Sequence, residues 1–274
     1  MRASIQRGID NQYRYITANG LPNHEHGVFP NRGNPNAIKS QTYSYTMPYH
    51  PNKNSSLTPL GIYTFGIAIN SVIFDPVTAG FWNNDTNSDW RYEAFPKGLG
   101  IDSNNAHVQP NGSYHYDGAP IGLINSITNK VNPKLVGYAA DGFPIYAYSN
   151  FSLKPSYILK KGQRPNDSPT GKYDGTFIED HIYQKGLGDL DECNGINKPT
   201  GEYPKGIYQY VVTDEFPYVS RCFMGTPNKS FIKKHLLHGE ISRPNSKYQG
   251  RQNIKSKQHN KKNGKKHNSL HKTH

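Results

Sequence analysis

Short runs of alternating polar and apolar side chains, divided by glycine and proline, make up most of this chain. The 274 residues include 26 Gly and 20 Pro. Alternation is typical of β-strands, whose side chains point to opposite faces in turn, and Gly and Pro are typical of the turns between them. Clear examples are residues 40–47, 134–140 and 206–213. We therefore expect a mostly-β fold, a single sandwich-like or irregular β domain with long ordered loops.

Four further stretches refine this expectation. Residues 61–69 predict one nearly continuous buried strand, or two strands with a break. The pair Asp141-Gly142 lies between two strand-like runs and predicts a tight turn. Residues 20–36 lack periodicity but are rich in turn-forming residues, so we expect an ordered loop. The helix signal is weak, and residues 121–130 carry the best of it.

Positive charge is concentrated at the C-terminal end. Residues 229–274 hold 13 of the 32 Lys and Arg but only one of the 20 acids, which leaves 19 of each sign before residue 229. Because few apolar residues follow Ile241, we expect a β domain over residues 1–228 and a disordered basic tail over 229–274. Such a tail either binds a polyanion, meaning nucleic acid or an acidic surface, or serves as a solubilising terminus.

Several classes of protein are disfavoured. No apolar run approaches the ~18–20 residues that cross a bilayer, so we expect no transmembrane segment. Residues 1–7 lack the apolar core of a secretory signal, so we expect no signal peptide in this chain. The glycine-rich motifs of the common nucleotide-binding loops are absent, and no nucleotide cofactor is expected.

The side chains of residues 113–117 can place several functional groups on one surface. In an extended run, His115 and Asp117 share one face, whereas Tyr114 and Tyr116 share the other. The preceding residues 110–112, Pro-Asn-Gly, predict a turn.

That turn folds His107 back beside His115. Two imidazoles and the carboxylate of Asp117 then form a ligand set suited to a divalent or transition-metal ion. His24 and His26, two residues apart, share a face if extended and are candidates for additional ligands. The alternative is that these side chains hydrogen-bond to the backbone and brace the loops.

The motif around His115 resembles the YHYH family, named for a Tyr-His-Tyr-His motif. The matching runs are Ala106-His107-Val108-Gln109-Pro110 and Tyr114-His115-Tyr116-Asp117-Gly118. Further matching landmarks are residues 20–24, 33–36, 138–146, 190–195 and 216–223, so the resemblance extends over roughly residues 15–227. The resemblance implies an exported protein of unassigned activity. Asp117 stands where the second His is expected, and a carboxylate is a harder ligand, which weakens a preference for copper or zinc.

A second group of oxygen ligands occurs at Asp189, Asp191, Glu192 and Asn194. These residues predict either a cation-binding loop or a tight turn, and their spacing differs from that of an EF-hand. The turn is the favoured interpretation.

Cys193 and Cys222 are the two cysteines of the chain. Both lie within the family-like motifs. They form either one disulfide, typical of an oxidising compartment, or two buried thiols.

An aromatic cluster is expected around Trp82 and Trp90, with Phe81 and Tyr92. Core packing is the favoured interpretation, and a wall for a sugar or an apolar ligand is the alternative.

The sequence thus predicts an uncharacterised YHYH-type domain with a metal site. If the protein is an enzyme, metal-assisted redox or hydrolytic chemistry is the class that the residues indicate, although they assign no general acid or base. The alternative is a non-enzymatic structural or surface protein whose basic tail binds a polyanion. Heavy use of Asn, Lys, Ile and Tyr is typical of AT-rich genomes such as those of large DNA viruses, which extends this alternative to a virion-associated role.

Overall fold

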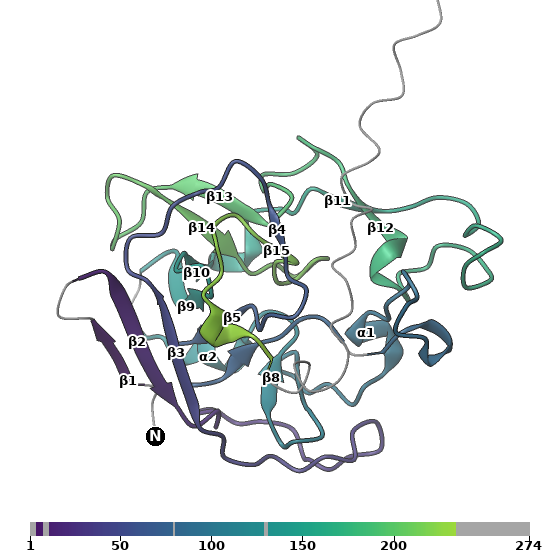
Figure 1. Ribbon diagram of the computed structural model, residues 1–274, viewed down its shortest axis with the longest axis horizontal. Coiled ribbons are helices and arrows are strands. Elements are labelled where there is room, and N and C mark those ends of the chain that lie inside the picture. The colour runs from purple at the N-terminus through teal and green to yellow at the C-terminus, as the bar shows by residue number, and fades with distance from the viewer. Residues whose placement is uncertain (1–3, 8–10, 79, 129–130, 234–274) are drawn as a thin grey trace, which may run out of the picture. The chain divides into compact units, whose positions relative to one another are not determined.

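The computed structural model describes residues 4–7, 11–78, 80–128 and 131–233 (Figure 1). The predicted basic tail lies outside the described residues from position 234 onward, and so does its predicted disorder. None of the helices in the described part of the chain is long and apolar enough to cross a membrane.

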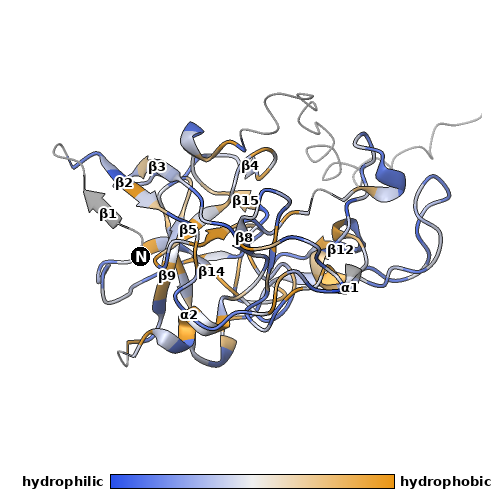
Figure 2. Ribbon diagram, turned by 90° about the horizontal axis from the view of Figure 1, so that it is seen from below, coloured by the Kyte–Doolittle hydropathy of each residue, from blue (hydrophilic) through white to orange (hydrophobic). Residues whose placement is uncertain are grey.

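A curled, mixed sheet of eight strands forms the centre of the fold, which confirms the mostly-β prediction. Its spatial order is β13-β14-β10-β9-β5-β6-β8-β7, with parallel pairs at β10–β14 and β6–β8. The strands are β5 (Gly66–Ala68), β6 (Ile73–Phe74), β7 (Ala106–Val108), β8 (Tyr114–Tyr116), β9 (Lys134–Ala139), β10 (Pro144–Ala147), β13 (Gly195–Lys198) and β14 (Ile207–Val211). Figure 2 shows apolar residues gathered in the strands and hydrophilic residues in the loops.

A second sheet of three antiparallel strands is joined to the first by a buried arginine. The strands are β1 (Ser4–Arg7), β2 (Tyr13–Ala18) and β3 (Tyr43–Pro48). The Arg14 guanidinium lies 4.4 Å from the ring centroids of both Tyr49 and Tyr138, and it donates hydrogen bonds to the carbonyls of Pro48 and Gly142. Arg14 therefore ties β2 to the turn between β9 and β10.

The remaining elements are short. They are the paired strands β4 (Thr58–Pro59) with β15 (Cys222–Phe223) and β11 (Tyr157–Leu159) with β12 (His181–Tyr183), the helices α1 (Ala94–Lys97) and α2 (Ile121–Ser126), and the 3-10 turns η1 (Trp82–Asn84), η2 (Ser149–Phe151), η3 (Ile178–Asp180) and η4 (Lys229–Phe231).

The predicted elements are mostly present, with shorter bounds. The Asp141-Gly142 turn between β9 and β10 is confirmed, and Gly142 has the positive φ of 91° that glycine tolerates best. Residues 61–69 contribute only β5 to a strand, because a turn at Gly61, with φ of 51°, precedes it. Helix α2 covers only the first part of residues 121–130.

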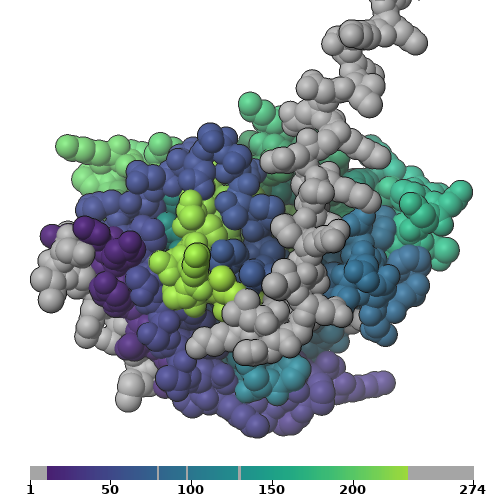
Figure 3. All heavy atoms as spheres, viewed as in Figure 1, coloured from purple at the N-terminus to yellow at the C-terminus, as the bar shows by residue number. Residues whose placement is uncertain are grey.

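The hydrophobic core continues into η4. Phe231 is 1% exposed, and its ring stacks on Tyr45 with centroids 4.1 Å apart. The Thr64 N–H donates to the Phe231 carbonyl. In Figure 3 this yellow-green segment lies against the blue segments near residues 50–70. Residues 229–233, at the start of the predicted tail, therefore pack on the β domain.

Cys193 and Cys222 form a disulfide, which confirms the bridged alternative. Their Cα atoms lie 5.3 Å apart across a sequence separation of 29 residues. The bond links the turn before β13 to β15, two segments that belong to different sheets.

Candidate metal centre

The β7–β8 hairpin brings the two predicted imidazoles together. β7 and β8 pair antiparallel, and His107 lies directly opposite His115 in the register. The connecting turn is closed by a hydrogen bond from the Gly112 N–H to the Gln109 carbonyl, and Gly112 has a φ of 86°. The two imidazole centroids are 4.3 Å apart. The predicted turn and the predicted pairing are thus both present.

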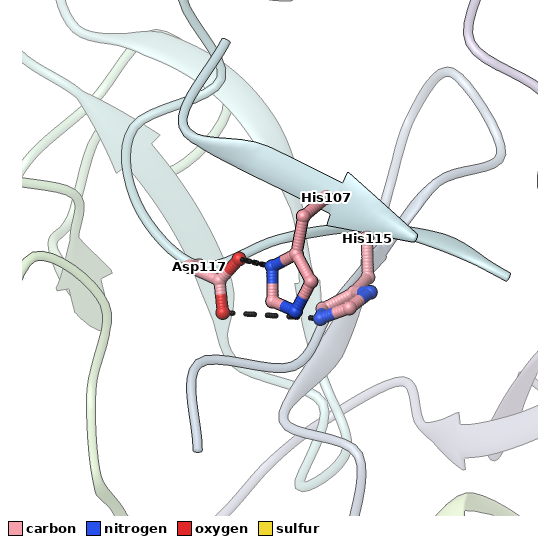
Figure 4. A group of neighbouring side chains, drawn as sticks. All are labelled: His107, His115 and Asp117. Atoms are coloured by element: carbon pink, nitrogen blue, oxygen red, sulfur yellow. Dashed lines mark hydrogen bonds and ion pairs between the residues drawn. The ribbon is translucent and has the colours of Figure 1, made fainter. Parts of the chain in front are cut away.

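Asp117 completes the cluster from the end of β8. Its backbone N–H donates to the Asn105 carbonyl, which fixes the residue next to the hairpin. Its Oδ2 lies 2.6 Å from Nδ1 of His107, and its Oδ1 lies 3.8 Å from Nε2 of His115 (Figure 4). Within the described residues, these three are the one group of three His, Cys, Asp or Glu side chains whose ligand atoms lie within 4.8 Å of one another.

The hydrogen bonds of His115 determine where its lone pair points. Nδ1 of His115 lies 3.3 Å from the Ser113 carbonyl. A carbonyl oxygen only accepts, so Nδ1 carries the hydrogen, and Nε2 of the neutral ring is an acceptor. Oδ1 of Asp117 is buried and has no hydrogen-bond partner among the described residues. Two acceptors therefore face each other 3.8 Å apart, an arrangement that is costly unless a proton, a water molecule or a cation satisfies them.

The environments of the two imidazoles differ. Burial, together with the neighbouring His107 ring, lowers the pKa of His115. Burial also acts to lower the pKa of His107, but the charge of Asp117 and its hydrogen bond outweigh burial and raise that pKa. His115 is consequently the neutral ring, whereas His107 is stabilised as a donor to Asp117.

Asp75 is a buried neighbour of the cluster that the sequence did not indicate. It follows β6, accepts a hydrogen bond from Gln109 Nε2 at 2.9 Å, and forms an ion pair with Lys233 Nζ at 2.5 Å. Its charge acts to raise the pKa of both imidazoles, but burial still leaves the pKa of His115 lowered. The parallel β6–β8 pairing places Asp75 beside the hairpin. No local pattern marks that pairing, so no sequence signal identified this residue.

His24 and His26, the candidate additional ligands, are not brought to this cluster. His24 Nε2 is hydrogen-bonded to the Tyr116 hydroxyl at 2.6 Å, and His26 Nδ1 donates to the Gly27 carbonyl at 2.8 Å. Tyr116 points to the face of β8 opposite to His115. A role of His24 or His26 as a ligand stays a prediction.

The contacts of the second group of oxygen ligands are those of a braced turn. Asp191 Oδ1 accepts from the backbone N–H groups of Cys193 and Gly195 and from the Tyr208 hydroxyl. Asp189 Oδ2 accepts from the Lys154 N–H. Asn194 Nδ2 donates to the Val211 carbonyl. Cation binding by Asp189, Asp191, Glu192 and Asn194 stays a prediction.

Comparison with known proteins gives one match. The model of the family described as YHYH protein matches residues 44–225, a range that contains the β7–β8 hairpin, Asp117 and both cysteines. No curated protein and no solved structure matches the chain.

Proposed function

The chain belongs to the YHYH protein family, and on that premise we propose that it binds one divalent transition-metal ion through His107, His115 and Asp117. The family has no assigned function. Support for the proposal therefore comes from the hydrogen bonds and distances of these three residues.

The facing acceptors carry the proposal. Nε2 of His115 and Oδ1 of Asp117 are 3.8 Å apart, and no donor among the described residues satisfies the carboxylate oxygen. Metal bonds to imidazole nitrogen and carboxylate oxygen are about 2.0–2.2 Å long, so one ion between the two atoms reaches both. A cation at this point removes the cost of two buried acceptors in contact.

Asp117 has a second role toward His107. Its Oδ2 accepts from Nδ1 of His107 at 2.6 Å, which leaves Nε2 of that ring free to act as the third ligand atom. A carboxylate that holds a histidine ligand in one tautomer and orientation is a common support of metal sites. Asp117 thus contributes one oxygen to the ion and the other to the position of His107.

Two nitrogens and one oxygen leave coordination positions open for water or a substrate. Zinc enzymes and non-haem iron(II) enzymes use sets of this kind. When bound, such an ion supplies Lewis acidity, or redox chemistry where the metal permits it. The half-buried His107 ring, 12% exposed, is the most accessible of the three side chains and marks the approach to the ion.

Elemental analysis of the purified full chain, after dialysis against a mixture of divalent ions, tests the proposal. We expect about one transition-metal ion per chain, and loss of that ion in Asp117→Asn and His115→Ala. His50→Ala is the matched control, because it removes an exposed imidazole far from the cluster in sequence. His24→Ala and His26→Ala show in the same assay whether either adds a ligand.

Circular dichroism of each variant separates loss of the ion from loss of the fold. A folded Asp117→Asn chain that keeps the ion would contradict the proposal. So would a wild-type chain that takes up no transition metal.

A further inference from the structure

Both tryptophans of the chain line a surface hollow outside the candidate metal centre. The hollow has a volume of about 280 Å³, and its lining includes Trp82, Trp90, Asn83, Asp85, Asn87 and Asp167. We propose that this hollow binds an uncharged saccharide, with the indole rings as the stacking surface and the amide and carboxylate groups as partners for hydroxyls.

The position of the indoles departs from the favoured sequence interpretation of core packing. Trp82 and Trp90 are half-buried, and neither belongs to the buried core of the described residues. The backbone N–H of Trp82 donates to the Trp90 carbonyl at 3.0 Å, so the two residues lie on adjacent segments. Trp90 packs edge-to-face on Phe177, with centroids 5.6 Å apart. The Arg164 guanidinium lies 6.0 Å from the centroid of the Trp90 ring, so this indole already has protein contacts. Because both indoles are half-buried and line the hollow, each still presents part of its surface there.

Two exposed polar side chains of the lining have no hydrogen-bond partner among the described residues, whereas Asp85, Asn87 and Ser88 do. Among the described residues, the side chains of Asn83 and Asp167 form no hydrogen bond, and neither does the indole N–H of Trp82 or Trp90. An apolar ring face beside free donors and acceptors matches the two faces of a sugar. Its C–H groups pack on an aromatic ring, and its hydroxyls bond to amide and carboxylate groups.

The two loops that form the hollow are held in place before any ligand binds. On one side, Asp85 Oδ1 accepts from the Asn87 N–H at 2.9 Å, and Asp85 O accepts from the Ser88 N–H. On the other side, the buried Arg164 donates to both carboxylate oxygens of Asp180 and to the Thr170 carbonyl, which anchors the loop that carries Asp167. A preformed site loses less conformational entropy on binding.

The charge of the lining selects the class of sugar. Asp85, Asp89 and Asp167 contribute carboxylates, and no lysine or arginine is among the described residues that line the hollow. Uronates and other acidic sugars are repelled by such a surface. Neutral hexoses and N-acetylhexosamines are not, so we assign the hollow to glycans made of these units.

The tryptophan content makes the test direct. Because the chain has only two tryptophans and both line the hollow, the fluorescence of the full chain reports on this site alone. The probes are cello-, manno- and N-acetylchito-oligosaccharides, with oligogalacturonates as the acidic comparison. We expect a saturable shift of the emission with at least one uncharged probe and a weaker response to the acidic one.

Variants then locate the binding by retention on the immobilised polysaccharide of the responding probe. Trp82→Ala and Trp90→Ala should each weaken retention by about tenfold or more, which corresponds to 1.4 kcal/mol. If a tryptophan variant is unfolded, Asp167→Asn replaces it in the test, because it is an isosteric change at an exposed position. This variant should also weaken retention. Tyr15→Ala is the matched control, because Tyr15 is an aromatic residue 45% exposed on β2.

Three results would overturn the proposal. The first is an emission spectrum that no uncharged oligosaccharide changes. The second is full retention of the folded tryptophan variants. The third is a saturable response to Ca²⁺ alone with none to any sugar, which would assign the carboxylates to a cation instead.

Discussion

At the scale of single residues, Asp117 distinguishes this chain from the pattern that gives its family a name. A carboxylate stands where that pattern has an imidazole, and both of its oxygens face histidine nitrogens. An imidazole at this position would offer at most one nitrogen to the ion and no anionic acceptor to His107. The aspartate therefore favours harder ions than a set of three imidazoles does.

Asp117→His tests this preference. We expect the variant to bind zinc or copper more tightly relative to manganese than the wild type does, because imidazole is the softer ligand. Competition between the ions at equilibrium, followed by elemental analysis, measures the ratio. Asp214→His makes the same substitution at an exposed acid, and it should leave the ratio unchanged. An unaltered ratio in Asp117→His would show that Asp117 is not a ligand.

Glu179 is expected to make the fold less stable as the pH rises. Burial raises the pKa of Glu179 to about 7, although its Oε2 accepts a hydrogen bond from the Arg91 N–H. The folded-state pKa lies above the unfolded value of about 4.5, so the folded state binds the proton more tightly. The stabilisation from this proton is complete below about pH 4.5 and is lost as the pH rises through about 7.

Glu179→Gln removes this titration and keeps an acceptor for the Arg91 N–H. We expect the free energy of unfolding of the wild type to fall between pH 5 and 8 by about 1–3 kcal/mol more than that of the variant. Urea unfolding at the two pH values measures the difference. The exposed Glu215→Gln is the control. Equal pH dependence in Glu179→Gln and wild type would show that this carboxyl has an ordinary pKa.

At the scale of elements, the β7–β8 hairpin shows what local sequence can predict. The turn residues and the alternation of side chains predicted that His107 lies beside His115 and that Asp117 shares their face, because both are properties of a few adjacent residues. Asp75 directly follows β6, and Lys233 lies in the segment after η4. Their positions depend on parallel pairing and on packing between distant segments, and no adjacent residues indicate either.

The same limit applies to the other elements. The strands β9, β10 and β14 were expected from alternation, but the docking of the three-stranded sheet depends on Arg14 between two tyrosines. A charged residue in a strand-like run normally indicates a solvent-exposed face. Its burial requires ring faces and carbonyls from segments distant in sequence, and only the folded chain brings these together.

Gly112→Ala tests how far the hairpin turn controls the metal centre. At a φ of 86°, an alanine is strained, and its Cβ would lie 2.6 Å from Cβ of Lys39. We expect a loss of stability of about 1–3 kcal/mol, since an incompatible φ and a steric contact add. Because the turn sets the register of His107 against His115, the affinity for the ion should fall as well.

Gly162→Ala is the matched control for this variant. Gly162 has a φ of 95°, but nothing lies within 4 Å of an added Cβ. It should therefore show the strain of the positive φ without the contact and without any effect on the ion. Equal losses in both variants, with unchanged metal affinity, would mean that the turn does not position the histidines.

At the scale of the whole molecule, the disulfide constrains the chain over a long loop. Cys193 and Cys222 are 29 residues apart, and a loop of that length contributes about 3–4 kcal/mol in the chain-entropy model. We expect the Cys193→Ala/Cys222→Ala chain to lose about this much unfolding free energy in denaturant. A reductant should lower the stability of the wild type to a similar level and leave the double variant unchanged. A double variant as stable as the oxidised wild type would contradict this expectation.

The described part of the chain ends at Lys233, and this boundary determines how the function of the basic tail can be tested. Phe231 is buried against Tyr45, so removal of residues from 229 onward would damage the core as well as the charge. Truncation after Lys233 retains η4 and removes residues 234–274, which hold 11 Lys or Arg and one acid. The remaining chain keeps the sheets and the disulfide, and its stability should match that of the full chain.

If the tail binds polyanions, the full chain should bind double-stranded DNA with an affinity that falls steeply with salt. The logarithm of the association constant decreases by about 0.9 for each phosphate contact per decade of salt, because every contact releases a condensed counterion. Fluorescence anisotropy between low and moderate salt gives this slope, and the truncated chain should bind weakly with a slope near zero. Equal binding by both chains would place the anion site on the β domain, whose first 228 residues have balanced charge. Balanced charge gives no long-range attraction, so an anion site on the β domain would have to be a local cluster of charge. The slope of the salt dependence would then give the number of its phosphate contacts.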